Sequence, residues 1–240
     1  MKNKIAVEAI NLSKEFQLDK RKSLPILKEV SFTANYGEFI SILGVSGSGK
    51  STLLKCVSSL LEPTAGQVMI DDQNPYHLKN RKLAALRRQK LAVIFQNYNL
   101  IPALPVIENI CLPLRLSKKK ICKQDVKRLL DSFQFQAGLD DFVRTLSGGE
   151  QQKVAIARAI LSDSQIIFAD EPTGALDSSS RKIIFDLLKN LARQGKCVIM
   201  VTHDLELASY TDKSLILKDG KIVQEIYNPS VNELYKALEN

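Results

Sequence analysis

A complete phosphate loop, set between a predicted strand and a predicted helix, most limits the fold of this chain. Eight consecutive residues match the pattern G-x-x-x-x-G-K-[ST] without a gap: Gly44, Val45, Ser46, Gly47, Ser48, Gly49, Lys50 and Ser51. The apolar segment Phe39–Leu43 has the length of a strand, and the run from Thr52 is typical of a helix. A Gly/Ser-rich turn without a ligand is the alternative, but the lysine, the hydroxyl and the flanking elements argue against it.

The residue types of this loop suit the phosphates of a nucleotide. Glycines allow backbone N–H groups to turn toward phosphate oxygens, and the N-terminus of the following helix adds a partial positive charge. Lys50 is predicted to place its ammonium near the β and γ phosphates, and Ser51 to ligate magnesium through its hydroxyl. The motif and the next residue, Thr52, therefore predict a site for a nucleotide.

Four apolar runs predict the strands of a parallel sheet. They are nearly uninterrupted rather than alternating, which is typical of strands buried on both faces. The runs are Phe39–Leu43, residues 91–95, residues 166–169 and Cys197–Val201. Helical stretches lie between them, so the pattern indicates an α/β fold. Because ligands of open α/β sheets bind beyond the carboxyl ends of the strands, the polar residues after each run are expected at one edge. They are the phosphate loop, Gln96, Asp170-Glu171 and His203.

The remaining segments predict smaller parts around this sheet. Residues 5–10, 27–33 and 66–71 are shorter and more alternating, and they predict an antiparallel sheet beside the parallel one. Residues 97–145 predict a mostly helical insertion. A short terminal helix is expected to begin near Ser230 or Asn232.

Two carboxylates after residues 166–169 are candidates for catalysis. Asp170 suits a magnesium partner, and Glu171 is placed to polarise a water for attack on the γ phosphate. The alternative is that one of them caps the next helix, but the phosphate loop favours the paired carboxylates. For His203, the position at the same edge favours a donor to the γ phosphate over a structural histidine.

A second glycine-rich loop, Leu146-Ser147-Gly148-Gly149-Glu150, has no lysine. Ser147 and Glu150 fit the capping box S-x-x-E at the start of a helix over residues 150–160, which would make the glycines a tight turn. A capped helix N-terminus preceded by glycines is also an anion site. The residues alone leave both interpretations open, and the two are compatible.

In combination, these motifs resemble those of ATP-binding cassette (ABC) ATPases over nearly the whole chain and in that family's order. The matching positions are the signature (residues 146–152), the Q-loop glutamine (Gln96), the D-loop (Ala175-Leu176-Asp177), the switch histidine (His203) and an adenine-stacking aromatic (Phe16). For Phe16 alone, a core residue at a strand end is an equal alternative.

The resemblance implies a P-loop NTPase with a mostly parallel RecA-like core sheet, an N-terminal antiparallel β subdomain and a helical signature subdomain. One domain would span residues 1–240, with the core and β subdomain in 1–95 and 161–225, the helical subdomain in 97–160 and a tail in 226–240. ATP and Mg²⁺ would be the cofactors, with Glu171, His203 and Gln96 in catalysis and Ser51, Gln96 and Asp170 around the metal. Besides the phosphate loop, the ATP-binding residues would be Phe16, Thr52, Ser147, Gly148, Gly149, Glu150 and Asp177.

A narrower resemblance is to the subfamily of macrolide exporters and lipoprotein-release transporters, and within it to the bacitracin-type branch that handles antimicrobial peptides. It is carried by the runs around Gln96, Asp170 and His203. Two positions depart from the family pattern. Lys153 replaces the usual arginine after the signature, which removes a bidentate contact. The proline often found shortly before the signature is absent.

The resemblance implies the ATPase subunit of a membrane transporter. Two copies would sandwich two ATP molecules, and the segment after Gln96 would receive cytoplasmic coupling elements of a separate permease. The chain would thus be cytoplasmic and peripheral on the inner face of the membrane, since it has no apolar run of membrane-spanning length and residues 1–8 lack a signal-peptide core. Export of, or resistance to, antimicrobial peptides, macrolides or lipid-linked compounds is the expected role.

Net charge and missing motifs bear on the alternatives. The net charge of +8 suits a nucleic acid or an anionic membrane surface, but solvated faces and loops are the favoured interpretation of the basic clusters. No basic cluster alternates with aromatic residues as a base-stacking platform would, so no nucleic-acid partner is expected. A soluble ABC protein acting on ribosomes or DNA usually has two cassettes or a special insertion, and this chain has neither. A GTPase would need an N-K-x-D motif, which is absent.

Overall fold

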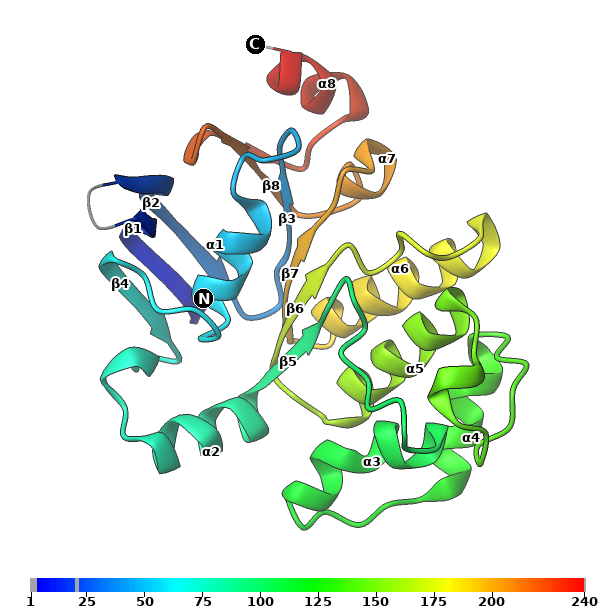
Figure 1. Cartoon of the computed structure of the whole chain (residues 1–240). Helices are drawn as coiled ribbons and strands as arrows, with labels where there is room; N and C mark the ends of the chain where they lie inside the picture. The colour runs from blue at the N-terminus through cyan, green and yellow to red at the C-terminus, as the bar shows by residue number, and fades with distance from the viewer. Residues whose placement is uncertain (1–3, 20–21, 240) are drawn as a thin grey trace.

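A six-stranded sheet forms the centre of the molecule, in a computed structural model that describes residues 4–19 and 22–239. The first three residues of the N-terminal stretch discussed above lie outside the described residues. In spatial order the strands are β5 (Leu91–Ile94), β6 (Ile166–Asp170), β7 (Cys197–Val201), β3 (Phe39–Leu43), β8 (Lys213–Lys218) and β9 (Lys221–Tyr227). All neighbours are parallel except β8 and β9 (Figure 1). The four predicted parallel strands are confirmed.

Both faces of this sheet are covered, which explains the uninterrupted apolar runs. Every residue of β3, β6 and β7 is buried. Successive side chains point to opposite faces of a strand, so Phe39 packs in the core on the helical side while Ile40 packs in the core on the other side. The parallel register also brings the strand ends level, with Asp170 opposite Val201.

The last two strands were not predicted. β8 begins with Lys213 and Ser214, two polar residues that are nevertheless buried, so no continuous apolar run marks its start. Asp219 and Gly220 form the two-residue turn to β9, with φ of 49° and 80°. An Asp-Gly pair between strand-like segments is a hairpin signal, so this hairpin could have been found from the sequence.

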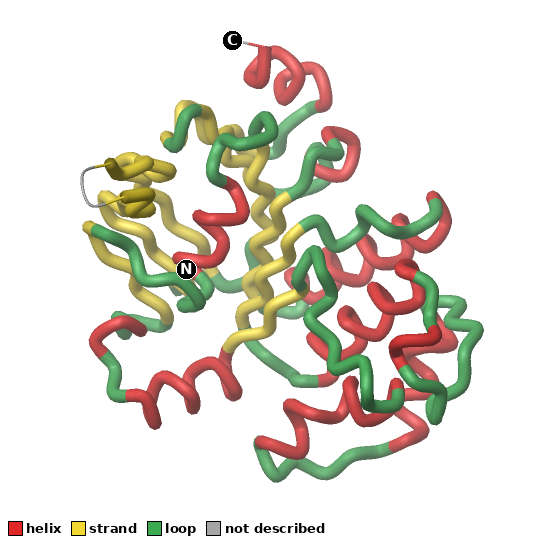
Figure 2. Tube along the Cα trace, in the orientation of Figure 1, coloured by secondary structure: helices red, strands yellow, loops and turns green. Residues whose placement is uncertain are grey.

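The antiparallel sheet predicted in the N-terminal third is confirmed. Its order is β2 (Lys22–Asn35), β1 (Ile5–Asp19) and β4 (Ala65–Ile70), and Figure 2 shows the strands in two groups. β1 and β2 are longer than predicted and pair through several register shifts. A backbone hydrogen bond of 2.8 Å from Lys28 N to Gly220 O connects this sheet to the β8–β9 hairpin.

The helices pack around the two sheets. They are α1 (Lys50–Val57), α2 (Asn80–Lys90), α3 (Val106–Leu116), α4 (Lys123–Ser132), α5 (Gly148–Leu161), α6 (Ser178–Arg193), α7 (Leu205–Ala208) and α8 (Val231–Glu239), with 3₁₀ turns at Pro75–His77 and Val143–Thr145. α3, α4 and α5 lie together at one side of the molecule (Figure 1), so the helical insertion is confirmed. In the described residues, no helix is both long and apolar enough to span a bilayer.

The terminal helix begins where the sequence predicted it. Ser230 Oγ accepts a hydrogen bond from Glu233 N at 3.3 Å, and the Glu233 carboxylate accepts one from Ser230 N at 2.9 Å. This reciprocal pair is a complete capping box. It fixes the start of α8 at Val231.

Candidate active site

The phosphate loop joins β3 to α1 with little room to spare. A Cβ added to Gly44 would lie 2.2 Å from the carbonyl oxygen of Leu217, so only glycine fits there. Gly49 has a φ of 103°, which favours glycine, and it directly precedes α1. No side chain caps the first turn of α1. The N–H groups of this turn are therefore available to an anion, as expected of a phosphate site.

The Lys50 side chain folds back over this loop. Its Nζ donates hydrogen bonds to the carbonyl oxygens of Gly44 at 2.8 Å and Val45 at 2.9 Å. Burial lowers the pKa of Lys50, and the nearby carboxylates Glu171 and Asp170 oppose that shift. The ammonium is thus held at the mouth of the loop by acceptors that a phosphate can replace.

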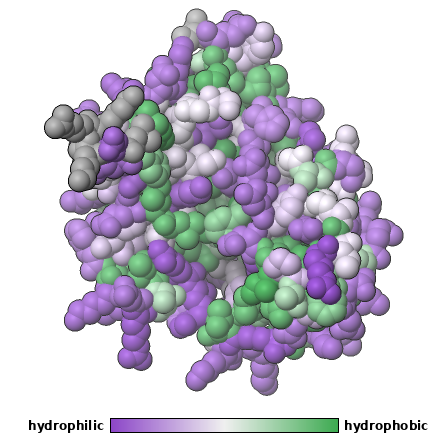
Figure 3. Space-filling model, viewed as in Figure 1, coloured by the Kyte–Doolittle hydropathy of each residue, from purple (hydrophilic) through white to green (hydrophobic). Residues whose placement is uncertain are grey.

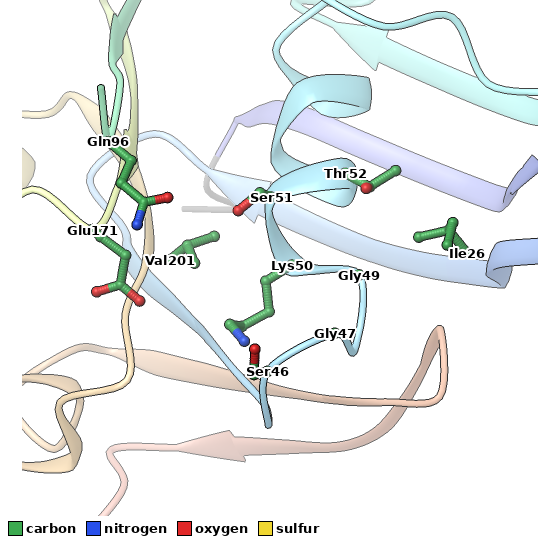
Figure 4. Close-up of a pocket in the computed structure, with 10 residues that line it drawn as sticks. All are labelled: Ile26, Ser46, Gly47, Gly49, Lys50, Ser51, Thr52, Gln96, Glu171 and Val201. Carbon is green, nitrogen blue, oxygen red and sulfur yellow. The ribbon is translucent and has the colours of Figure 1, made fainter. Parts of the chain in front are cut away.

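A pocket of about 380 Å³ opens above the loop (Figure 4). Its lining is Ile26, Ser46, Gly47, Gly49, Lys50, Ser51, Thr52, Gln96, Glu171 and Val201. Gln96 and Glu171 face Lys50 across the pocket from the ends of β5 and β6. Eight predicted site residues are therefore brought together here. Ile26 and Val201 are additions that no sequence motif marks.

A second cavity, of about 360 Å³, adjoins this pocket and contains the predicted metal residues. Ser51, Gln96 and Asp170 are among its lining residues. Ser51 Oγ donates to Asp170 Oδ1 at 3.1 Å. Burial raises the pKa of Asp170, while the hydrogen bond from Ser51 acts in the opposite direction. A hydroxyl, an amide oxygen and a carboxylate are the oxygen ligands that Mg²⁺ prefers, so the donor set fits this ion.

Glu171 has an unusual backbone conformation that directs its side chain. Its φ is 49°, in the left-handed region that non-glycine residues rarely adopt, and its N–H donates to Val201 O at 3.0 Å. The carboxylate oxygen Oε2 lies 2.9 Å from Nδ1 of His203. The His203 side chain is largely exposed and is not part of the pocket lining. Glu171 and His203 thus lie at one edge, as predicted, and their direct contact is an addition that the sequence did not indicate.

The second glycine-rich loop caps α5 in a way that the sequence predicted only in part. Ser147 Oγ accepts from Glu150 N at 3.2 Å, which is one half of a capping box. The other half is missing, because the Glu150 carboxylate accepts instead from Gln136 N at 3.2 Å and Lys153 Nζ at 2.9 Å. The prediction of a complete capping box is therefore wrong. The buried Lys153 makes single-atom contacts, as expected when it replaces an arginine.

The second loop contacts other motifs and not its own chain's phosphate pocket. None of Ser147, Gly148, Gly149 and Glu150 lines that pocket, among the residues that the structure describes. A Cβ at Gly148 would lie 3.0 Å from the Tyr98 hydroxyl. At Gly149, a Cβ would lie 3.2 Å from the carbonyl oxygen of Ala175. The loop thus packs between the segment after Gln96 and the Ala175–Asp177 turn.

Two further predicted residues also lie outside the pocket lining. Asp177 caps α6 by accepting from Ser180 N at 2.9 Å, and hydrogen bonds from Ser179 and Ser180 lower its pKa. Phe16 is 40% exposed on β1, with Lys14 Nζ 5.3 Å from the centre of its ring. This exposure rules out the alternative of a core residue for Phe16.

The arrangement of phosphate loop, paired carboxylates and second loop agrees with a comparison against known families. The sequence profile described as ABC transporter matches residues 27–174 of this chain, more than half of its length. The chain belongs to the ABC transporter family. It is an ABC ATPase, which binds and hydrolyses ATP, and the alternative of a GTPase is excluded.

Relatives of this ABC ATPase match the subfamily inferred from its motifs. It is 40% identical over 210 residues to the macrolide export ATP-binding/permease protein MacB of Campylobacter jejuni, covering 87% of this chain and 33% of MacB. The chain thus spans a third of the length of that relative. It is 43% identical over 203 residues to the lipoprotein-releasing system ATP-binding protein LolD of Aquifex aeolicus, covering 84% of this chain and 91% of LolD.

Solved structures confirm the predicted P-loop fold. A dimeric post-hydrolysis structure of the cassette MJ0796 of Methanocaldococcus jannaschii, bound to ADP and Pi, has a TM-score of 0.87 and 37% identity. The match covers 93% of this ABC ATPase and 99% of that chain.

Proposed function

We propose that this ABC ATPase is the energy-supplying subunit of a membrane transporter whose permease is a separate chain. The observation that carries the proposal is the separation of its two glycine-rich loops. The phosphate-loop pocket contains Lys50 and Glu171 but no residue of the Ser147 loop. One chain therefore holds two half-sites, and a second copy would complete each of them.

Within one such site, the roles follow from the contacts. Glu171 would accept a proton from the attacking water, because its carboxylate faces the pocket beside Lys50. His203 would orient Glu171 and donate to the γ phosphate, and Lys50 would exchange its two carbonyl partners for phosphate oxygens. A magnesium ion held by Ser51, Gln96 and Asp170 would neutralise phosphate charge.

Across the dimer, the partner's second loop would close the site. The capped N-terminus of α5 would face the γ phosphate with its free N–H groups, and Asp177 would border the same interface. Phe16 is solvent-exposed on β1, so we propose that it stacks on adenine. MJ0796, a similar cassette, is dimeric with ADP and Pi bound.

The proposed substrate class is supported by the names of the relatives alone. MacB is named for macrolide export and LolD for lipoprotein release. We propose that this chain sits on the inner face of the cell membrane, bound to its permease by the segment after Gln96, and supports export of or resistance to antimicrobial peptides, macrolides or lipid-linked compounds. We also propose a single domain over residues 1–240 with the subdomain boundaries expected from the sequence.

The test is the ATP-dependent dimerisation of Glu171→Gln. This change keeps the shape of the side chain but removes the base, so the variant should not turn over and should accumulate as an ATP-bound dimer. Light scattering after size exclusion, with saturating ATP and magnesium, measures the mass. Lys50→Ala in the Glu171→Gln background is the matched control and should remain monomeric, because it weakens phosphate binding. A Glu171→Gln protein that stays monomeric would contradict the sandwich. Co-purification with a multi-spanning permease tests the partner separately.

A further inference from the structure

The net positive charge of this chain comes from one stretch of it. Residues 73–124 contain eleven Lys and Arg and a single acidic residue, Glu108, which gives a net charge of +10. The whole chain has a net charge of +8, so the other 188 residues carry −2. Because summed charge sets the potential over a surface, the location of these side chains in the fold decides which surface is positive.

The fold places the two basic segments of this stretch side by side. The first is α2 with its preceding residue Lys79, and the second is the connection from α3 to α4. A cavity of about 150 Å³ beside α2 is lined by Arg87 and Arg88 of α2, Pro113 of α3 and Ser162 after α5. Lys119 Nζ donates to the carbonyl oxygen of the same Ser162 at 3.5 Å. α2 and α3 together form the edge of the molecule opposite α8 (Figure 1).

Part of this charge is used inside the protein. Glu108, the acidic residue of the stretch, pairs with Arg115. Lys90 pairs with Asp71 at 3.1 Å, and Arg87 donates to the backbone and side chain of Ser59. These contacts hold α2 and α3 in place. Arg87, Lys90 and Arg115 are therefore engaged within the protein and are not counted as available to an external partner.

Five other cations face solvent without an ionic partner, and we call them the basic edge: Arg81, Lys82, Arg88, Lys118 and Lys120. All five are exposed, and no ion pair within the described part of the chain involves any of them. Figure 3 shows hydrophilic side chains projecting from the lower margin of the molecule, where Figure 1 places α2 and α3. The basic edge is thus open to an anionic partner of its own.

The neighbours of the basic edge indicate which anion suits it. Leu116, at the end of α3, is 62% exposed next to the lysine run that begins at Lys118. A basic cluster beside an exposed aliphatic side chain suits a lipid surface, which offers phosphates and an apolar layer below them. α2, α3 and the connection to α4 contain no aromatic residue. Single-stranded nucleic acids are held largely by stacking on aromatic rings, so the edge lacks what they require.

We propose that the basic edge binds the anionic phospholipid headgroups of a bilayer. This contact would not need a permease, because the five side chains are exposed and make no ion pair within the described residues. Each basic residue near an anionic membrane contributes a factor of about five to binding. Five such residues make the contact measurable for the isolated chain at low salt.

The experiment uses the full chain without a permease. Co-sedimentation is measured with vesicles of pure phosphatidylcholine and with vesicles that contain phosphatidylglycerol as a third of their lipid. The chain should bind only the second kind, and binding should fall at about 1 M salt, where charges are screened within about 3 Å. Arg81→Glu/Arg88→Glu/Lys118→Glu should weaken binding by at least about 100-fold.

The matched control is Lys28→Glu/Lys182→Glu/Lys221→Glu, which makes the same change in net charge at three exposed lysines outside the basic edge. It should retain binding to within about threefold, since its positions lie away from the bilayer. Unchanged ATPase activity shows that both variants are folded. An equal loss in the control would reduce the effect to net charge and overturn the proposal. So would the absence of binding to anionic vesicles, or tighter binding of the chain to RNA or duplex DNA than to the vesicles at equal salt.

Discussion

Nδ1 of His203 lies 2.9 Å from Oε2 of Glu171, although the His203 side chain is 76% exposed and that of Glu171 is 15% exposed. The histidine thus reaches inward to the carboxylate from the protein surface. His203 contacts the carboxylate of Glu171. The backbone of Glu171, with a φ of 49°, already directs this side chain toward the pocket. Two independent constraints therefore fix the position of the proposed catalytic base.

His203→Ala removes one of these constraints and the proposed donor to the γ phosphate. We expect kcat for ATP hydrolysis to fall by about 100-fold or more, as when a preorganised donor is lost, with a smaller change in KM. Steady-state phosphate release measures both constants. His77→Ala alters the other histidine of the chain, which is exposed in a 3₁₀ turn, and should leave both constants unchanged. Equal rates for His203→Ala and wild type would exclude the donor role.

Substitutions of Ser147 separate its role as a helix cap from its proposed contact with ATP across a dimer. Ser147→Ala removes the acceptor for Glu150 N and should destabilise the chain by about 1 kcal/mol. Ser147→Asp restores a good cap but places a negative charge against the proposed γ phosphate. It should keep wild-type stability in urea unfolding and lose ATPase activity. If Ser147→Asp hydrolyses ATP normally, the loop acts only as a cap.

Asp170→Asn should stabilise the protein in the absence of nucleotide. Because burial raises the pKa of Asp170, its carboxylate binds a proton more tightly in the folded state than in the unfolded state. Its contribution to the free energy of unfolding therefore falls as pH rises from the ordinary carboxyl pKa through the raised one. At pH 7 the asparagine avoids this loss, and each 1 kcal/mol gained raises Tm by about 2–4 °C.

The gain in Tm should shrink as the pH is lowered toward the ordinary carboxyl pKa of about 4, because the raised pKa of Asp170 makes its protonation in the folded state increase over that range. Magnesium-dependent ATPase activity should be lost in the same variant. Asp186→Asn, at an exposed position on α6, serves as the control and should change neither quantity. A Tm below that of wild type at pH 7 would show that the charged form of Asp170 stabilises the fold.

Lys213→Ala should lower the free energy of unfolding more than the substitution of any exposed lysine. The Lys213 side chain is buried on β8, and its Nζ donates to Thr33 O at 2.6 Å and lies within 4 Å of Glu38 and Glu225. Removal of this ammonium leaves two carboxylates without their cation, a loss of roughly 3–5 kcal/mol. Lys221→Ala, on the exposed neighbouring strand, should change stability by less than about 0.5 kcal/mol. Urea unfolding measures both, and similar values for the two would contradict the buried-charge account.

Much of the central sheet was predictable because its strands are buried on both faces. The side chains of β3, β6 and β7 are all apolar or small up to their polar ends, so they stand out in the sequence. β8 was missed because its buried Lys213 finds its partners in β2, Glu38 and β9, which are distant in sequence. The periodicity of apolar residues along the sequence gives no information about such distant partners.

The site was predictable to a similar extent and for a related reason. Motif residues at the ends of parallel strands, such as Gln96 and Glu171, meet because the strand ends are level. The contacts of Glu150 were not predictable, since its carboxylate turns away from Ser147 to Gln136 and Lys153. Gln136 N and Lys153 Nζ, rather than Ser147, thus determine the orientation of the Glu150 carboxylate, and of these two only Lys153 lies on α5.

Helix α5 connects the Ser147 loop to the segment after Gln96. Near its C-terminal end, Arg158 holds the carbonyl oxygens of Tyr98 at 2.9 Å and Asn99 at 2.7 Å, and at its start Gly148 lies against the Tyr98 hydroxyl. A helix of 14 residues is a rod about 21 Å long. The segment after Gln96 thus contacts α5 near both ends of the helix. We therefore expect a displacement of that segment to move α5, and with it the Ser147 loop at the start of the helix.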